Sequence, residues 1–250
     1  MPRPLRHLRW AALALALPGF TAAQTPLPDA KELMARHNAA IGNRAVLEQH
    51  STVRLAGTMS MPAMGMEATV EVFRGKPNKM LQRIGLGAMG EMTQGFDGTV
   101  AWVLPPAGME AQVQQGEAAE QARTQADFFS NFQDPNHYAK AETVELTDFE
   151  GKKCYKVKVT RGTREGIEYF DSATGLLAGI QGSQSTPMGP VEYTTVMREY
   201  KEVDGVKFPS KIEQRAGPQT VVMTFTQIEF DKVDSTVFAL PDAVKAKIRP

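Results

Sequence analysis

Cysteine is almost absent from this chain of 250 residues, which has only Cys154. One thiol cannot form an intramolecular disulfide, so the fold has to be stable without one even in an oxidising compartment. Cys154 lies in a strand pattern, on the same predicted face as Lys156 and Lys158. We interpret it as a structural thiol; the alternative is a thiol made reactive by these lysines.

A membrane-spanning run is lacking near the N-terminus. The apolar run Trp10–Leu17, even extended to Phe20, falls short of the roughly 20 residues that a spanning helix needs. Arg6 and Arg9 precede this run, and the small residues Thr21-Ala22-Ala23 follow it. This arrangement is typical of a cleavable signal peptide, so we predict that the protein is exported.

The predicted signal peptide covers residues 1–23, and residues 24–250 are expected to form a single domain. About 227 residues are enough to bury a sizeable core. Gln24 stands where a lipoprotein would carry its lipid-modified cysteine. We therefore expect an unanchored, soluble protein of the periplasm or the extracellular space.

Neither sign of charge is in excess. Lys and Arg total 28, and so do Asp and Glu. Loss of Arg3, Arg6 and Arg9 with the signal peptide would leave the mature chain slightly acidic. No basic patch is present to recruit nucleic acid or anionic lipid, so nucleic acid is not an expected partner.

Catalytic motifs are lacking too. Outside the signal peptide the histidines are His37, His50 and His137, and no two have the spacing of metal ligands. The sequence has no H-E-x-x-H, no G-x-S-x-G and no glycine-rich phosphate loop. Asp97 and Asp171 fall in predicted turns, where aspartate side chains bond to the backbone. We therefore expect no enzyme, no catalytic residues, no metal centre and no cofactor.

What the mature chain does have is a short helical start and then a long β pattern. Asp29 can cap a helix whose apolar residues repeat from Leu33 to Ile41. A second, shorter helical turn is predicted at 44–49. From Ser51 the hydrophobic period changes to two, with turn signals about every eight to twelve residues, which is typical of an antiparallel meander.

About eleven strands are predicted, joined by hairpin turns such as Asp97-Gly98 and Asp204-Gly205. With two helices available to cover one face, the fold class is mainly β. The predicted strands are Thr52–Met61, Met66–Arg74, Lys79–Leu86, Val100–Leu104, Glu142–Thr147, Lys152–Thr160, Arg164–Phe170, Leu176–Ser183, Val191–Lys201, Val206–Gln214 and Thr220–Glu229.

One segment interrupts the β pattern. Glu117–Phe132 is rich in Ala and Gln, and its one β-branched residue is Thr124. This composition predicts an amphipathic helix inserted into the sheet, which we expect to act as a lid. Its apolar stripe comprises Ala118, Ala122, Ala126, Phe129 and Phe132.

The aromatic residues indicate where the interior lies. Trp102 is on an apolar strand face, and Phe128, Phe129 and Phe132 on the predicted helix are the expected partners of that face. A long sheet that is curved and covered by helices leaves an apolar cleft rather than a solid core.

Methionine is concentrated in one hairpin, where Met59, Met61, Met64 and Met66 lie close together. Thioether side chains are flexible and polarizable, so a surface made of them adapts to ligands of variable shape, such as acyl chains. The alternative is that these residues fill gaps in a core. A further alternative is Cu(I) binding by the soft sulfurs of the M-x-M spacing, with His50 just upstream.

Several motifs occur in a recognisable order after the N-terminal helix. They are Gly95-Phe-Asp-Gly-Thr-Val-Ala-Trp102, Tyr169-Phe-Asp-Ser-Ala-Thr-Gly-Leu-Leu177, Tyr200-Lys-Glu-Val-Asp-Gly-Val-Lys-Phe-Pro209 and the closing Asp234-Ser-Thr-Val-Phe-Ala-Leu-Pro241. In their order and spacing they resemble the LolA-like superfamily of exported lipoprotein-sorting proteins, over most of the mature chain.

The resemblance implies an incomplete antiparallel β-barrel of about eleven strands, with helices covering the concave face. In the carriers of this family a hydrophobic cavity receives lipoprotein acyl chains, and there are no catalytic residues to transfer. The positions whose pattern faces such a cavity here are Met59, Met61, Met66, Met80, Met92, Trp102, Phe129 and Phe132.

We therefore expect a periplasmic binding protein that shields a lipid or lipoprotein acyl chain during trafficking to the outer membrane. A membrane transporter or receptor would be its further partner. The alternative is a non-enzymatic interaction or envelope-sensing module that uses the same concave face. The third hypothesis is a methionine-rich Cu(I)-binding protein.

Overall fold

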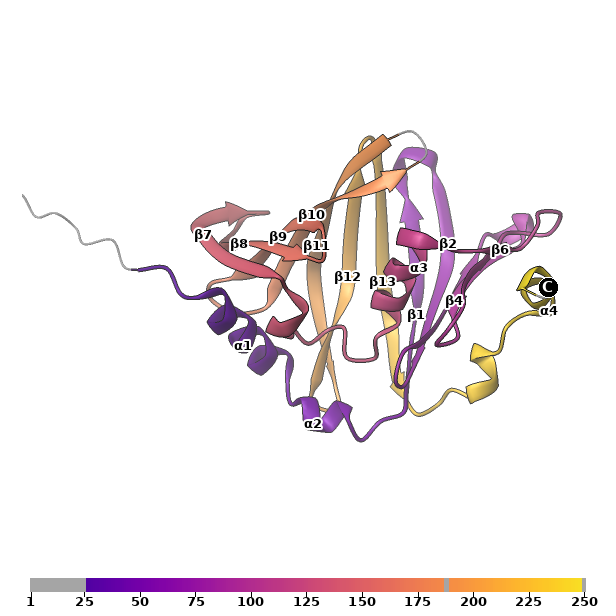
Figure 1. Cartoon of the computed structure of the whole chain (residues 1–250), viewed down its shortest axis with the longest axis horizontal. Coiled ribbons are helices and arrows are strands. Elements are labelled where there is room, and N and C mark those ends of the chain that lie inside the picture. The colour runs from indigo at the N-terminus through magenta and orange to yellow at the C-terminus, as the bar shows by residue number, and fades with distance from the viewer. Residues whose placement is uncertain (1–25, 187–188, 249–250) are drawn as a thin grey trace, which may run out of the picture.

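The computed structural model describes residues 26–186 and 189–248, so the predicted signal peptide lies outside the described residues. The described chain forms a 13-stranded sheet with helices on its surfaces (Figure 1). The strands are β1 (Thr52–Met61), β2 (Met66–Gly75), β3 (Lys79–Gly85), β4 (Glu91–Phe96), β5 (Ala101–Leu104), β6 (Gln112–Val113), β7 (Lys140–Phe149), β8 (Lys152–Arg161), β9 (Arg164–Asp171), β10 (Leu177–Thr186), β11 (Gly189–Val203), β12 (Val206–Ala216) and β13 (Gln219–Phe230).

The helices are short and begin at side-chain caps where the sequence supplies them. Asp29 accepts a hydrogen bond from the Lys31 amide at 2.8 Å, which confirms the predicted start of the first helix. Asn43 caps the second in the same way. The α-helices are α1 (Ala30–Ile41), α2 (Arg44–Leu47), α3 (Gly116–Ala126) and α4 (Asp242–Ile248), and the 3-10 turns are η1 (Pro62–Met64), η2 (Gly87–Met89), η3 (Pro135–His137) and η4 (Ser235–Phe238).

The strand order is β6-β5-β4-β3-β2-β1-β13-β12-β11-β10-β9-β8-β7, and neighbouring strands are antiparallel. Two meanders therefore run outward from a central pair, β1 and β13. The order ends at β6 and β7, and in the part of the chain that is described these two strands do not pair, so the barrel is incomplete as expected. There are thirteen strands rather than about eleven, in part because β6 has two residues and is too short to show a period of two.

The two faces of the sheet are covered by different parts of the chain. The inner face carries α1, α2 and α3 (Figure 1). On the outer face the C-terminal segment packs through Phe238 and Val244 against Phe73 and Leu81. Successive side chains of a strand point to opposite faces of the sheet. Alternate residues of one strand therefore contact different covering segments.

The predicted helix Glu117–Phe132 is wrong at its C-terminal end, because α3 stops at Ala126. The Asp127 carboxylate accepts a hydrogen bond from the Phe129 amide at 2.9 Å, a local turn that competes with further helix. The Phe128 amide bonds instead to the Pro77 carbonyl at 3.2 Å. Phe129 and Phe132 therefore lie beyond the helix, and no lid helix carries them.

Candidate ligand-binding face

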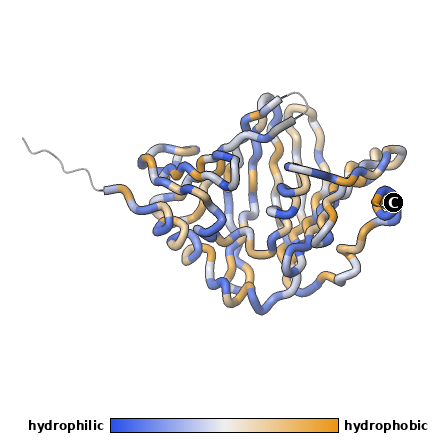
Figure 2. The backbone as a smooth tube through the Cα atoms, in the orientation of Figure 1, coloured by the Kyte–Doolittle hydropathy of each residue, from blue (hydrophilic) through white to orange (hydrophobic). Residues whose placement is uncertain are grey.

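An apolar cluster, here called the inner cluster, occupies the inner face around the central strands. Apolar and polar residues alternate along these strands (Figure 2). The apolar side chains therefore gather on one face of the sheet and form a continuous apolar surface. The buried members are Ile41, Leu47, Val53, Leu55, Met59, Ala68, Val70, Ile84, Phe128, Phe132, Val206, Phe208, Phe225, Ile228 and Phe230.

Burial on this face decreases along the central strands. On β1, Val53 is 1% exposed and Met59 is 6% exposed, whereas Met61 is only partly buried. On β13, Phe230 is buried and Met223 is only partly buried. One end of the face is therefore filled by α2 and neighbouring segments, while the other end stays apolar and accessible. We call the accessible part the open half; it comprises Met61, Leu86, Met92, Ile212, Val221 and Met223.

The structure brings five of the eight predicted lining residues into the inner cluster or against it. These are Met59, Met61, Met92, Phe129 and Phe132. Met66 lies directly opposite Met61 across the β1–β2 pair, and cross-strand partners share a face. Met80 is buried beside these residues but under α3, where it packs against Ala126.

The expected packing of Trp102 against the phenylalanines of 128–132 is wrong. On β5 the inward residue is Ala101, so Trp102 points to the outer face and packs with Leu81 and Phe238. Its indole lies over the cross-strand partner Gly95, where a β-carbon would approach Cζ2 to 2.8 Å. Trp102 is therefore a core residue of the outer face and lies away from the open half.

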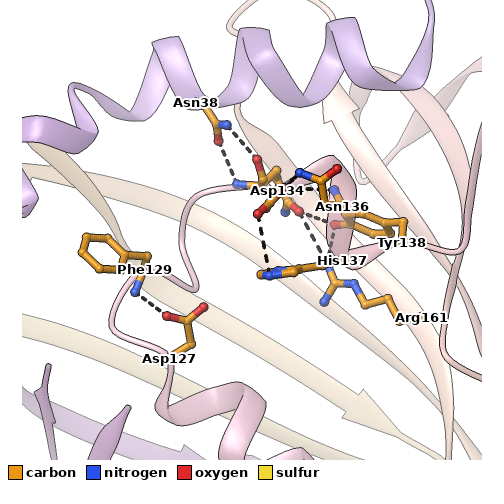
Figure 3. Close-up of polar contacts among 9 residues, drawn as sticks. Asn38, Asp127, Phe129, Asp134, Asn136, His137, Tyr138 and Arg161 are labelled. Carbon is orange, nitrogen blue, oxygen red and sulfur yellow. Dashed lines mark hydrogen bonds and ion pairs between the residues drawn. The ribbon is translucent and has the colours of Figure 1, made fainter. Parts of the chain in front are cut away.

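Residues 127–138, here called the strap, leave α3 and cross to α1 (Figure 3). Asn38 on α1 binds Gln133 in both directions: its Nδ2 donates to the Gln133 carbonyl at 2.8 Å, and its Oδ1 accepts from the Gln133 amide at 2.7 Å. One turn of α1 thus fixes the middle of the strap through two reciprocal hydrogen bonds.

His37 provides a second tie between α1 and the strap. Its Nδ1 accepts from the Leu177 amide at 3.0 Å, so its Nε2 carries the proton and donates to the Asn131 carbonyl at 3.1 Å. Burial lowers the pKa of His37, which keeps the ring neutral with this tautomer. The histidine is therefore a structural residue with both ring nitrogens hydrogen-bonded.

Arg74 is a polar side chain on the inner face that the strap covers. Its Nη1 donates to the Ser130 hydroxyl at 2.7 Å, and its Nε has no hydrogen-bond partner among the described residues. Burial lowers the pKa of Arg74, while the charge of Asp127 acts in the opposite direction. Ser130 and Asp127 of the strap therefore stabilise this partly buried cation.

The end of the strap enters a buried polar network. The Tyr138 hydroxyl donates to Glu168 at 2.9 Å, and Arg161 donates to Glu168 at 2.8 Å. Tyr138 also contacts Arg161 and Gln133 (Figure 3). Burial raises the pKa of Glu168 and the pKa of Tyr138. No motif links these residues in the sequence, which is why sequence reasoning missed them.

The cover formed by α3 is much lighter than the strap. The helix contacts the sheet through Ala119, Ala122 and Ala126, which meet Met80 and Phe96. Alanine buries little area, so few contacts hold α3 in place. The inner face is thus closed firmly by the strap and loosely by α3.

Other hollows and sites differ in character from the open half. A groove of about 1020 Å³ on β7–β11 is lined by charged side chains such as Lys140, Glu142 and Lys158. Among the described residues, no group of three or more His, Cys, Asp or Glu side chains is placed to hold a metal ion. Within the same residues no helix has the length and apolarity to span a bilayer.

No protein-family model and no curated protein matches the sequence. Solved structures do match over most of their length. A DUF1329 family protein from Desulfovibrio piger has a TM-score of 0.60 at 10% identity and covers 84% of this chain and 97% of its own. A putative outer membrane lipoprotein-sorting protein domain from Vibrio parahaemolyticus has a TM-score of 0.57 at 11% identity, with the same coverage.

A LolA superfamily protein from Nitrosomonas europaea has a TM-score of 0.56 at 12% identity, and the match covers 86% of this chain and 99% of that one. Identities this low establish shape and leave function to be argued from the site. The chain has a LolA-like fold.

Proposed function

We propose that this chain is a periplasmic carrier whose open half shields a lipid or lipoprotein acyl chain from water. The observation that carries the proposal is the decrease of burial along β1 and β13, which leaves an apolar surface accessible inside a curved sheet. An exposed apolar surface on a concave face is a typical binding site. A membrane transporter or receptor would load and unload the cargo.

Hydrophobic burial is large enough to account for useful affinity. Burying one methylene contributes about 0.8 kcal/mol, so about fourteen buried methylenes contribute about 11 kcal/mol. Micromolar binding needs about 8 kcal/mol, and the difference covers the ordering of the chain. Cargo handling of this kind needs no covalent chemistry and therefore no catalytic residue.

Native mass spectrometry of the exported protein, purified without detergent and combined with lipid extraction, tests the proposal. We expect a co-purified acyl lipid or lipopeptide, or uptake of an added fluorescent fatty acid. An empty protein that also takes up no fatty acid would contradict the carrier and favour the alternative, in which the open half docks a partner protein.

Two polar substitutions on the open half should weaken binding of the fluorescent fatty acid. Val221→Asn combined with Met223→Asn puts two amides on the inner face of β13, and we expect affinity to fall roughly tenfold. Val222→Asn is the matched control, because Val222 lies between them and points to the other face. Equal affinity of the double variant and the control in a fluorescence titration would contradict the assignment.

Cu(I) binding is the second candidate, because the structure places methionines opposite one another on the inner face. Met59 pairs with Met223, and Met61 pairs with Met66. If thioethers bind Cu(I) here, changing Met59, Met61 and Met66 to Leu should abolish competition with a colorimetric Cu(I) chelator, since leucine has similar volume but no sulfur. Fatty acid uptake retained by the variant would separate the two ligands, and unchanged copper competition would exclude this site.

A further inference from the structure

Three hairpin turns at one end of the sheet each present a methionine to solvent. Met64 is 62% exposed, Met89 is 61% exposed and Met109 is 68% exposed, which makes them the three most exposed large apolar side chains among the described residues. They belong to the β1–β2, β3–β4 and β5–β6 turns. Because strands β1 to β6 neighbour one another in chain order and are antiparallel, these three turns lie at the same end of the sheet.

The turns are also uncharged. Segments 59–66, 85–90 and 104–109 contain no Asp, Glu, Lys or Arg. The turns at the opposite end of the same strands differ, since they carry Lys76 and Asp97. Solvent-exposed turns are ordinarily polar, so three apolar turns at one end need a reason. We call Met64, Met89 and Met109 the tip patch.

Two of the three turns of the tip patch lie against each other. Gly90 beside η2 lies against Pro106 and Ala107 of the β5–β6 turn. After that turn, Glu110 pairs with Lys247 of α4 at 2.6 Å, and Glu67 and Glu91 stand at the starts of β2 and β4, beside the other two turns. The β3–β4 and β5–β6 turns are therefore fixed relative to each other, and the three turn segments carry no charge of their own.

The patch is continuous with the open half. Met61 directly precedes the β1–β2 turn, and Leu86 directly precedes η2. A surface that covers the tips would therefore also cover the accessible end of the inner face. Protruding single side chains on three convex turns fit a deformable apolar medium better than a rigid protein surface, which would have to offer three separate pockets.

We propose that the tip patch docks this protein on a lipid bilayer, with Met64, Met89 and Met109 inserted at the boundary between headgroups and acyl chains. Flexible thioethers without hydrogen-bonding groups enter this boundary at low cost. The turns have no Lys or Arg, so docking needs no anionic lipid and is insensitive to salt. The role in cargo transfer rests on the proposed function, whereas docking itself does not.

Flotation with vesicles of phosphatidylcholine, a neutral lipid, tests the proposal. The exported protein is used after mass spectrometry has verified its N-terminus, so that the run Trp10–Leu17 does not contribute. We expect the wild type to float with the vesicles equally at low and high salt. Changing Met64, Met89 and Met109 together to Ser should reduce the bound fraction roughly tenfold or more. Leu146→Ser, at an exposed leucine on β7, is the matched control and should bind as the wild type does.

A second measurement follows the tips directly. The M64C variant carries an environment-sensitive dye; Cys154 is buried with its pKa raised to about 11, so it does not react. Dye emission should increase on addition of vesicles, and dye on L146C should not respond. A wild type that does not float, or a triple variant that floats equally well, would overturn the proposal. The carrier function has a separate readout, the uptake of fatty acid. If the protein binds vesicles but takes up no fatty acid, the docking proposal stands and the carrier proposal fails. If it takes up fatty acid but does not float, the carrier proposal stands and the docking proposal fails.

Discussion

Truncation of Phe128 to Ala should lower the free energy of unfolding by about 3–5 kcal/mol. Phe128 is 2% exposed in the inner cluster and packs edge to face on Phe129, with ring centroids 5.5 Å apart. Its removal leaves a cavity where the strap begins. Urea unfolding followed by circular dichroism measures the loss.

Phe129→Ala is the natural control, because Phe129 is only partly buried in the same segment. We expect a loss of about 1 kcal/mol for this variant. Equal losses for the two phenylalanines would show that the strap does not owe its position to Phe128.

Replacing Arg161 with Met should destabilise the protein by about 2–3 kcal/mol at pH 7. The change leaves Glu168, whose side chain is 2% exposed, with a buried charge that only Tyr138 still stabilises. Arg161 itself is 40% exposed, so solvent screens part of its interaction, and we place the loss below that of a fully buried pair.

The loss should depend on pH in a defined direction. The pKa of Glu168 is raised in the folded protein, so its contribution to stability is full below the ordinary glutamate pKa and is lost as pH rises through the raised value. Removing Arg161 raises that pKa further, so the variant should recover towards wild-type stability as pH falls below neutral.

Adding Glu168→Gln to the Arg161 variant provides the check on this explanation. The double variant has no buried charge, so its stability should vary less with pH than that of the single variant. A deficit in the single variant that is the same at pH 5 and pH 8 would contradict the role assigned to Glu168.

Local patterns predicted most of the elements. Asp29 begins α1 as expected, and β1 covers the predicted residues, because caps and a period of two act over a few residues. The end of α3 was missed because one side chain, Asp127, diverts the backbone although the Ala-rich composition favours more helix. The face of Trp102 is predicted wrongly because a hydrophobic period of two shows which residues share a face of the sheet. It does not show which segment of the chain packs on that face.

The site was predictable only in part for the same reason. Alternation puts Met59 and Met61 on one face, but the contact of Met59 with Met223 depends on the pairing of β1 with β13. The network of Tyr138, Arg161 and Glu168 likewise forms only when the strap meets β8 and β9. Contacts between distant segments are set by the whole fold, and no short pattern specifies them.

The pairing of β1 with β13 also determines when folding can finish. Val53 pairs with Phe230, so the middle of the sheet joins residues near opposite ends of the chain. Such a contact closes a long loop and is slow to form, whereas the meanders on either side consist of local hairpins. Until β13 arrives, β1 is an edge strand with an unpaired backbone that can pair with another chain. A nascent chain ending at Ala216 would contain twelve strands but lack the one that joins its two halves.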